Sequence, residues 1–156
     1  GYKFVAPNET GGFFWGNTDW ADDGSTTGKL VETDETDCSA EAGYYFLKAD
    51  TDELTYNATP VNWGIIGAAT PTGWDSDTDL VYDAATKTLA VDIHLVPGPF
   101  KFRGNNEWGA FDLGTEDADG ILTGGGDLTF DGSEGNYRVV LDLSNPREYT
   151  YSVTAN

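Results

Sequence analysis

The sequence repeats itself at an interval close to the size of one small β domain. Five short segments of the N-terminal part recur in the same order further along the chain, displaced by about 88 to 98 residues. The matched pairs are Tyr2–Phe4 with Phe100–Phe102, Asp19–Ala21 with Glu107–Gly109, Gly28–Leu30 with Gly120–Leu122, Ala42–Tyr45 with Glu134–Tyr137, and Leu54–Tyr56 with Tyr149–Tyr151. An ordered series of this kind indicates two copies of one fold.

The two copies are unequal in length. The second has about 40 residues, Val61–Pro99, ahead of its Phe-Lys-Phe strand, whereas the first begins at the equivalent strand. We therefore expect residues 1–59 to be the C-terminal half of a domain and residues 60–156 to be a complete one. The absence of Met favours a processed or trimmed piece of a longer product. A half domain needs cover for its strand edges and apolar face, either from residues ahead of Gly1 or from another molecule.

Alternating apolar and polar residues in short runs predict β-strands. The runs are Tyr44–Lys48, Leu54–Asn57, Thr88–Leu95, Phe100–Arg103, Tyr137–Leu143 and Tyr149–Val153. Gly, Pro or clusters of Asp and Thr interrupt every window long enough for a helix. The sequence therefore predicts an all-β protein, specifically an immunoglobulin-like β-sandwich. Trp63 begins a further strand and is expected beside the core.

The charge of the chain excludes several classes of partner. Its 27 acidic residues against 8 Lys and Arg give a net charge of −19, which repels nucleic-acid phosphates and anionic lipid. One cysteine, Cys38, and one histidine, His94, leave almost no material for disulfide, thiol or zinc chemistry. No apolar run approaches the roughly 20 residues that span a bilayer.

Two tryptophans on polar loops are the candidate binding residues. Trp74 lies in a turn-rich segment and Trp108 in a segment rich in Asn and Gly, where an exposed indole is costly unless it stacks on a ligand. Lys101 and Arg103 lie on the strand that leads to Trp108, on one face by period 2. With Asn106 they supply polar groups for sugar hydroxyls beside an indole face that packs on sugar C–H groups. Alternatively, both cations pair with some of the abundant carboxylates.

Four longer segments carry a resemblance to a known family: Trp63–Asp75, Gly98–Arg103, Gly135–Tyr137 and Leu141–Leu143. They resemble the repeated domains of SusE/SusF-type outer-membrane proteins of Bacteroidetes, which are tandem β-sandwich starch-binding domains on a surface lipoprotein. The order Trp, Lys, Trp also resembles the glycogen-binding modules of AMP-activated kinases. The resemblance implies that Trp74, Lys101 and Trp108 contact sugar, with Arg103 and Asn106 as weaker contacts. It also implies a place at the outer membrane, with an outer-membrane transporter complex as a partner.

The first copy and the N-terminus depart from that family. The first copy has no counterpart of the Gly73-Trp74 loop, so Lys3 and Trp20 would make only part of a site. The lipidated N-terminal cysteine of the family is absent, and Cys38 lies too far inside the chain to replace it. Membrane anchoring is thus implied by the resemblance alone.

Two acidic runs suggest a calcium site as a minority alternative. Asp75, Asp77 and Asp79 lie at alternate positions, and Thr115–Gly120 is similar. Neither run continues into the Gly and bidentate Glu of an EF-hand loop. Solvated turns are favoured, and no cofactor is expected.

The many carboxylates also suggest an alternative function, that of a glycosidase, because these enzymes need two carboxylates roughly 5 to 10 Å apart. With 27 acids some pair always lies that close. Asp92 and Asp142 lie between strand hydrophobes, but period 2 directs both toward solvent. We therefore expect no enzymatic activity.

These features favour a non-catalytic module that binds starch or another α-glucan, from a secreted or cell-surface protein. Stacking tryptophans alone do not separate α-glucan from xylan or mannan. The alternative is an extracellular fibre subunit, a homopolymer in which strands of one molecule complete the half domain of the next. The two functions are compatible, because a fibre can be built from a sugar-binding fold.

Overall fold

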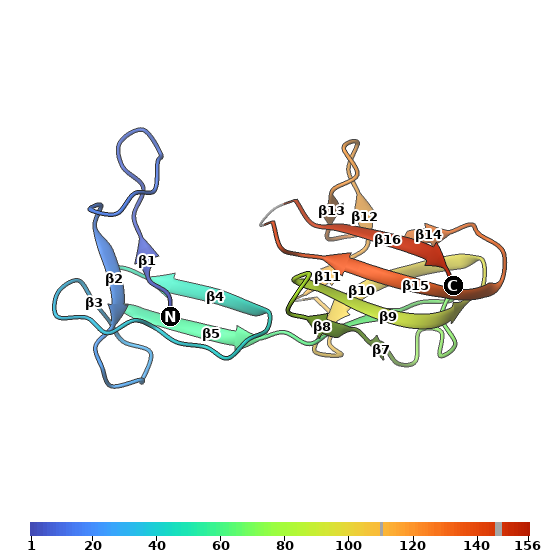
Figure 1. Cartoon of the computed structure of the whole chain (residues 1–156), viewed down its shortest axis with the longest axis horizontal. Coiled ribbons are helices and arrows are strands. Elements are labelled where there is room, and N and C mark those ends of the chain that lie inside the picture. The colour runs from blue at the N-terminus through green and yellow to red at the C-terminus, as the bar shows by residue number, and fades with distance from the viewer. Residues whose placement is uncertain (110, 146–147) are drawn as a thin grey trace. The chain divides into compact units, whose positions relative to one another are not determined.

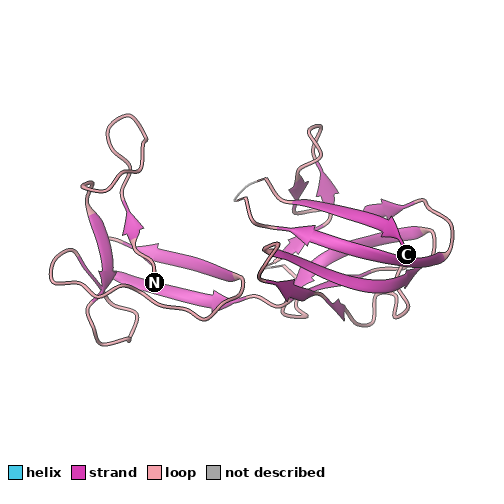
Figure 2. Cartoon of the chain, viewed as in Figure 1, coloured by secondary structure: helices cyan, strands magenta, loops and turns pink. Residues whose placement is uncertain are grey.

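The structure is a computed structural model that describes residues 1–109, 111–145 and 148–156 (Figure 1). Strands and loops make up all of these residues, which confirms the all-β class (Figure 2). No helix in this part of the chain could cross a membrane. The chain divides into two units, Gly1–Pro60 and Val61–Asn156, which we call unit 1 and unit 2.

All six strands expected from alternating patterns are present, most of them longer by a few residues. They are β4 (Tyr45–Asp50), β5 (Thr55–Pro60), β9 (Thr88–Leu95), β10 (Gly98–Gly104), β15 (Gly135–Asp142) and β16 (Thr150–Ala155). Trp63 is buried at the start of a further strand, as expected. The remaining strands, of two to four residues, were not predicted, because so few residues show no period.

Unit 2 contains two antiparallel sheets and a short ribbon. Its remaining strands are β6 (Trp63–Ile66), β7 (Thr78–Asp79), β8 (Val81–Asp83), β11 (Asp112–Leu113), β12 (Thr115–Glu116), β13 (Leu122–Thr123) and β14 (Leu128–Phe130). One sheet has the order β11-β10-β6-β7, with β14 also paired to β10, and the other has the order β16-β15-β9-β8. The ribbon is β12 with β13.

The core of unit 2 lies between its two sheets. Phe100 and Phe102 of β10 are fully buried, and both rings meet the ring of Tyr151 from β16, at centroid distances of 5.7 and 5.8 Å. Val139 and Leu141 of β15 are fully buried as well. Edge-to-face aromatic contacts of this kind join the inner faces of the sheets, as in a β-sandwich.

Unit 1 has a three-stranded sheet and a hairpin. The sheet consists of β1 (Phe4–Val5), β2 (Asp19–Asp22) and β3 (Leu30–Val31), and the hairpin of β4 and β5. The buried apolar residues described in unit 1 are Ala21, Leu30 and Cys38. Burial raises the pKa of the Cys38 thiol, which is not in a disulfide. So small a core supplies little hydrophobic stabilisation for about 60 residues.

The hairpins of the two units share one register. In unit 1 Tyr45 lies opposite Pro60 and Ala49 lies opposite Tyr56. In unit 2 Tyr137 lies opposite Ala155. Leu141 lies opposite Tyr151 in the same hairpin, at the spacing of Ala49 and Tyr56. The sequence repeat therefore corresponds to equivalent strand pairings, β4 with β5 and β15 with β16.

The aromatic contacts of the first strand also recur. Tyr2 packs edge-on against Phe4 at 5.7 Å, and Phe4 lies 5.9 Å from Tyr56. Phe100, Phe102 and Tyr151 make the same chain of contacts in unit 2, with the two Phe rings 5.8 Å apart. The three rings of unit 1 are only partly buried, whereas Phe100 and Phe102 are fully buried.

One pairing inferred from the sequence repeat is wrong. The sequence aligns Trp20 with Trp108, but Trp20 lies opposite Phe4 in β1, as Leu113 lies opposite Phe102 in β10. Trp20 therefore occupies the position of Leu113 and packs against the small core. The sequence match failed because the connecting loops differ in length, so the offset between the copies changes there.

A buried carboxylate holds unit 1 together. The Asp22 side chain accepts hydrogen bonds from the Tyr56 hydroxyl at 2.6 Å and from the backbone N–H groups of Thr26 and Gly24. These bonds, that of Tyr56 first, lower the pKa of Asp22, while the pKa of Tyr56 is raised. The carboxylate thus joins β2 to β5.

We expect Tyr56→Phe to lower the free energy of unfolding by about 2 kcal/mol, because it removes a hydrogen bond to a charged group. Asp22 has a lower pKa in the folded state than in the unfolded chain. Its contribution is therefore present above the unfolded value of about 3.9 and is lost as pH falls through the folded value. Calorimetric melting between pH 2 and 7 should show the gap between wild type and Asp22→Asn closing at acid pH. Asp92→Asn, at an exposed carboxylate, is the control and should change little.

Candidate functional site

The candidate site is built on β10 of unit 2. Phe100 and Phe102 point into the core, so the alternating residues Lys101 and Arg103 lie on the opposite face of the strand. Both cations are nevertheless buried, because β10 is an inner strand with partners on both sides and loops cover its outer face. Buried cations require partners.

Arg103 is held by Asp77. Its Nε donates to Asp77 Oδ2 at 3.1 Å and its Nη2 donates to Oδ1, with side chains only 7% and 1% exposed. Gly64 of β6 lies opposite Arg103 and makes room for this pair, since a Cβ there would lie 2.7 Å from the Asp77 Cβ. A bidentate, buried pair fixes the guanidinium plane.

Lys101 is held by two oxygens. Its Nζ donates to the Gly125 carbonyl at 2.5 Å and lies 3.3 Å from Asp112 Oδ1. Gly114 lacks the side chain that would meet the Lys101 Cε at 2.5 Å. An ammonium has three donors, so these contacts leave one available. In unit 1 Lys3 pairs with Asp19 at 3.2 Å in the same way.

Trp108 lies over the two cations. The Arg103 Cζ is 4.3 Å and the Lys101 Nζ 5.8 Å from the centroid of its ring. Cation–π attraction of this kind is strongest for tryptophan and for partly desolvated cations. Trp108 nevertheless remains 53% exposed, so part of the indole is available to a ligand.

Trp74 completes a pair of exposed rings. Its centroid lies 6.2 Å from that of Trp108, the ring planes differ by 44°, and it is 41% exposed. The loop that carries it is closed by a hydrogen bond from Gly67 N to Gly73 O at 3.0 Å. Gly67 has φ of 146° and lies against β10, where a Cβ would be 2.4 Å from the Phe100 Cα. The backbone thus fixes Trp74 beside Trp108.

The loop before Trp108 uses asparagines for its backbone shape. Asn105 and Asn106 have φ of 56° and 55°, which asparagine tolerates better than most residues. The Asn105 Oδ1 accepts a hydrogen bond from the Asn62 N–H at 2.9 Å. Asn106 lines a small hollow of about 330 Å³ whose described lining includes Trp63 but neither tryptophan of the pair.

The structure brings together four of the five site residues predicted from the sequence: Trp74, Lys101, Arg103 and Trp108. It does not place Asn106 with them. Both cations pair with carboxylates, the alternative left open by the sequence. The sequence did not single out Asp77 as the partner of Arg103 or Asp112 as that of Lys101. Strand pairing brings these two acids close to the cations, and no short pattern in the sequence indicates that pairing.

The two acidic runs differ in structure. The first contradicts the expectation of a solvated turn, because the Asp77 side chain is buried and the run ends in β7, whereas the second forms the turn between β12 and β13. Asp77 is engaged by Arg103, and Asp117 Oδ1 accepts the backbone N–H groups of Asp119 and Ile121. Within residues 1–109, 111–145 and 148–156, no three metal-ligating side chains lie close enough to hold an ion.

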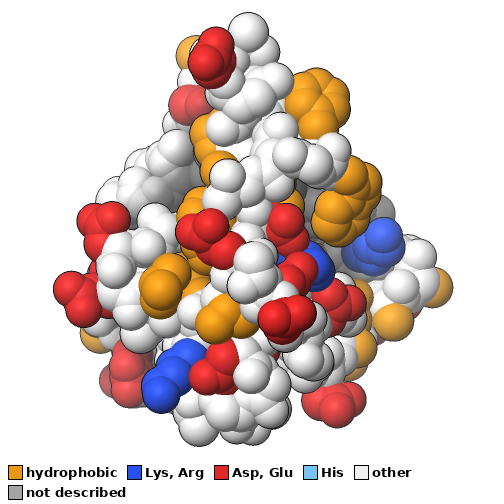
Figure 3. Space-filling model, turned by 90° about the vertical axis from the view of Figure 1, so that its left-hand side faces the viewer, with side chains coloured by type: hydrophobic (Ala, Val, Ile, Leu, Met, Phe, Trp, Pro, Cys, Tyr) orange, Lys and Arg blue, Asp and Glu red, His pale blue; other side chains and the backbone are white. Residues whose placement is uncertain are grey.

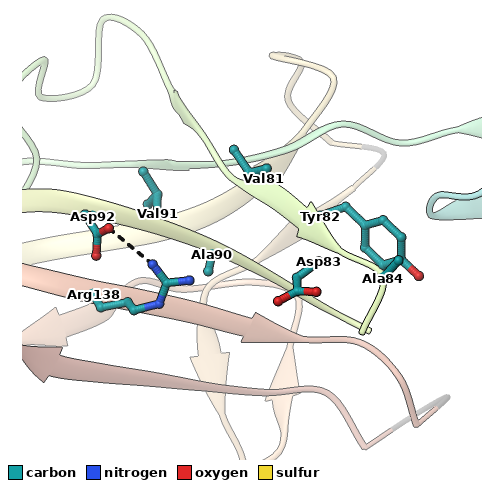
Figure 4. A pocket seen from close by; sticks show the side chains of 8 residues that line it. All are labelled: Val81, Tyr82, Asp83, Ala84, Ala90, Val91, Asp92 and Arg138. Atoms are coloured by element: carbon teal, nitrogen blue, oxygen red, sulfur yellow. Dashed lines mark hydrogen bonds and ion pairs between the residues drawn. The ribbon is translucent and has the colours of Figure 1, made fainter. Parts of the chain in front are cut away.

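A second hollow lies on the outer face of the β8-β9-β15 sheet. It has a volume of about 640 Å³, and Arg138 and Asp92 point toward each other inside it at 3.2 Å (Figure 4). Both are half exposed, so their pairing contributes little to stability. Its other lining residues are Val81, Tyr82, Asp83, Ala84, Ala90 and Val91.

Unit 1 exposes aromatic residues that sequence reasoning missed. Phe13, Phe14 and Trp15 lie in the loop between β1 and β2, which corresponds to the loop between β10 and β11 that carries Trp108. The amide of Asn17 braces this loop by donating to the carbonyls of Ala6 and Gly12. The surface in Figure 3 shows hydrophobic groups among many acidic and few basic side chains. The run of three consecutive aromatic residues in a Gly-rich segment is the sequence feature that could have predicted this exposed loop.

Comparisons of the chain with protein-family models, with curated proteins and with solved structures gave no match. The geometry of the site therefore carries the functional argument.

We expect Asp77→Ala to lower the free energy of unfolding by about 3 to 5 kcal/mol, because it leaves the buried Arg103 unpaired. Urea unfolding followed by circular dichroism measures this loss. The double variant Asp77→Ala/Arg103→Met should recover part of it, since no unpaired charge remains. Arg138→Ala, which breaks an exposed pair, is the control and should cost less than about 1 kcal/mol. Equal losses in the two single variants would contradict the structural role of Asp77.

Proposed function

We propose that unit 2 is a non-catalytic carbohydrate-binding module whose ligand stacks on Trp74 and Trp108. The observation that carries the proposal is the pair of adjacent, half-exposed indoles, 6.2 Å apart, with buried cations beneath one of them. An exposed aromatic platform on a rigid strand and its loops is a common form of ligand site. The resemblance to SusE/SusF-type domains supports the same function.

Arg103 and Lys101 have different roles beside the two indoles. Arg103 holds Trp108 in place through its ring contact, and its own plane is fixed by Asp77. Lys101 keeps one N–H donor beyond Gly125 and Asp112, which can bind a sugar hydroxyl at the edge of the rings. Arg103 is thus a positioning residue, and Lys101 a direct contact.

The tilt of the two rings favours an α-glucan. An α-1,4-linked glucan curves, so successive sugar rings turn their faces, whereas a β-1,4-linked glucan is a flat ribbon whose rings are nearly parallel. Two indoles inclined at 44° follow the curved chain better than the flat one. Stacking tryptophans alone do not distinguish α-glucan from other glycans. The angle between the two rings is therefore a separate reason to favour an α-glucan.

A site of this kind binds weakly. Two stacked sugar rings gain little against the entropy lost by a flexible glycan, and tandem copies raise the overall affinity. The net charge of −19 does not oppose a neutral polysaccharide. Placement at the cell surface beside an outer-membrane transporter is part of the same proposal and rests on the resemblance.

We expect Trp108→Ala and Trp74→Ala each to weaken glucan binding about tenfold or more, because each removes a stacking face. Affinity electrophoresis of the chain in amylopectin gels measures this. Trp15→Ala, which removes an exposed indole from unit 1, is the matched control and should keep the wild-type retardation. Retardation that is absent in wild type, or unchanged in both unit 2 variants, would refute the proposal.

The ring tilt gives a second test. The chain should be retarded by amylopectin and pullulan and should migrate freely in hydroxyethylcellulose and xylan, since the flat or differently curved chains contact one indole at a time. Equal retardation by α- and β-linked glucans would show that the angle does not select the ligand. A control protein of similar charge corrects for gel viscosity.

A further inference from the structure

The loop between β10 and β11 borders two surfaces of unit 2. Trp108 belongs to the pair of exposed indoles, whereas Asn106, two residues earlier, lines the hollow of about 330 Å³ described above. We call this second surface the amide hollow. Its described lining consists of Asn62, Trp63, Asp79, Leu80, Asn105 and Asn106. Its volume is at the lower end of the range for ligand pockets.

The amide hollow has an apolar floor and a polar rim. Trp63 and Leu80 are buried, at 8% and 7% exposure, and form the floor. Asn62, Asp79 and Asn106 are exposed and form the rim. Among the described lining residues Asp79 carries a negative charge and none carries a positive one. The lining therefore does not suit an anion, and it suits a neutral ligand with an apolar face and hydroxyl groups at its edge.

Three hydrogen bonds of the backbone hold the walls of the amide hollow in place. The Asn105 N–H donates to the Asn62 carbonyl at 2.8 Å, and the Asn62 N–H donates to the Asn105 Oδ1 at 2.9 Å. The Leu80 N–H donates to the Trp63 carbonyl at 2.8 Å, which joins the chain after β7 to β6. The hollow is therefore formed by unit 2 itself, and a ligand need not order it on binding.

Strand register places the amide hollow close to the two indoles. Arg103 lies opposite Gly64 and Gly64 lies opposite Asp79, so the three residues form one row across β10, β6 and β7 and share a face. Two strand spacings of about 4.8 Å separate Arg103, which contacts the Trp108 ring, from Asp79 at the rim of the hollow. One or two further sugar units of a glycan stacked on Trp108 cover this distance.

We propose that the amide hollow is a third sugar position of the glucan site, beyond those over Trp74 and Trp108. This inference rests on the proposed function of unit 2. One sugar ring places its C–H groups on the exposed part of Trp63, and its hydroxyls bond to the rim residues. An amide both donates and accepts hydrogen bonds and a carboxylate accepts them, which matches the hydroxyls of a sugar. The site thus selects chains of three or four sugar units over disaccharides.

Isothermal titration calorimetry with maltose and maltotetraose tests the third position. Maltose covers the two indoles and maltotetraose also reaches the hollow, so wild type should bind the longer glucan about tenfold more tightly. Asn106→Gly removes the amide and keeps the backbone φ of 55° at this position. It should bind maltose as wild type does and lose most of the gain for maltotetraose. Lys87→Gly, at φ of 58° in the turn between β8 and β9, is the matched control and should keep the full gain.

Nuclear magnetic resonance of the wild-type chain gives a readout that needs no substitution. The side-chain amide signals of Asn62 and Asn106 should shift with maltotetraose and stay in place with maltose. The indole N–H signals of Trp74 and Trp108 should shift with both glucans. This pattern separates contact at the hollow from contact at the indoles.

The third sugar position and the proposed function fail in different ways. If neither glucan binds, the proposed function is refuted and the third position with it. The third position alone is overturned if wild type binds both glucans equally, if Asn106→Gly keeps the gain, or if Lys87→Gly loses as much of it. It is also overturned if maltotetraose moves the indole signals and leaves both amide signals in place.

Discussion

The buried pair of Arg103 and Asp77 connects the core of unit 2 to its surface. A guanidinium in the interior is tolerated only with a fixed acceptor, and Asp77 supplies both oxygens from the loop ahead of β7. The same guanidinium lies under the ring of Trp108. The Arg103 side chain thus connects strand β10 to the loop that follows Trp74 and to the exposed indole of Trp108. These contacts hold the indole in a fixed position relative to the sheet.

The two units have equivalent strand pairings and side-chain contacts, but unit 2 buries them more completely. Both carry the same hairpin register, the same chain of three aromatic rings and the same lysine-to-aspartate pair on the first strand. In unit 2, β6 pairs with β10 and β9 pairs with β15, and the rings of Phe100 and Phe102 are fully buried. In unit 1 the equivalent rings are partly exposed, and the buried carboxylate of Asp22 contributes polar contacts where an apolar core is small.

Periodic segments of the sequence predicted structure well. Every strand of six or more residues was found, because alternation over that length is a strong signal, and the repeat predicted equivalent hairpins. The exposure of Trp74 and Trp108 was predicted from their polar surroundings, and the structure places the two rings together. The supporting acids of the site were missed because Asp77 reaches Arg103 through strand pairing across 26 positions. Trp20 was misaligned because loop length, which no local pattern encodes, shifts the offset.

Gly64, Gly67 and Gly114 lie around the site and contribute no side chain to it. Each stands where a methyl group would collide with a neighbour: an acid, the backbone of β10, or a lysine stem. Substitution at these positions would push apart the strands and loops that aim the indoles. Side-chain additions at these three glycines are therefore expected to disturb the strands and loops beneath Trp74 and Trp108, even though none of the three adjoins either tryptophan in the sequence.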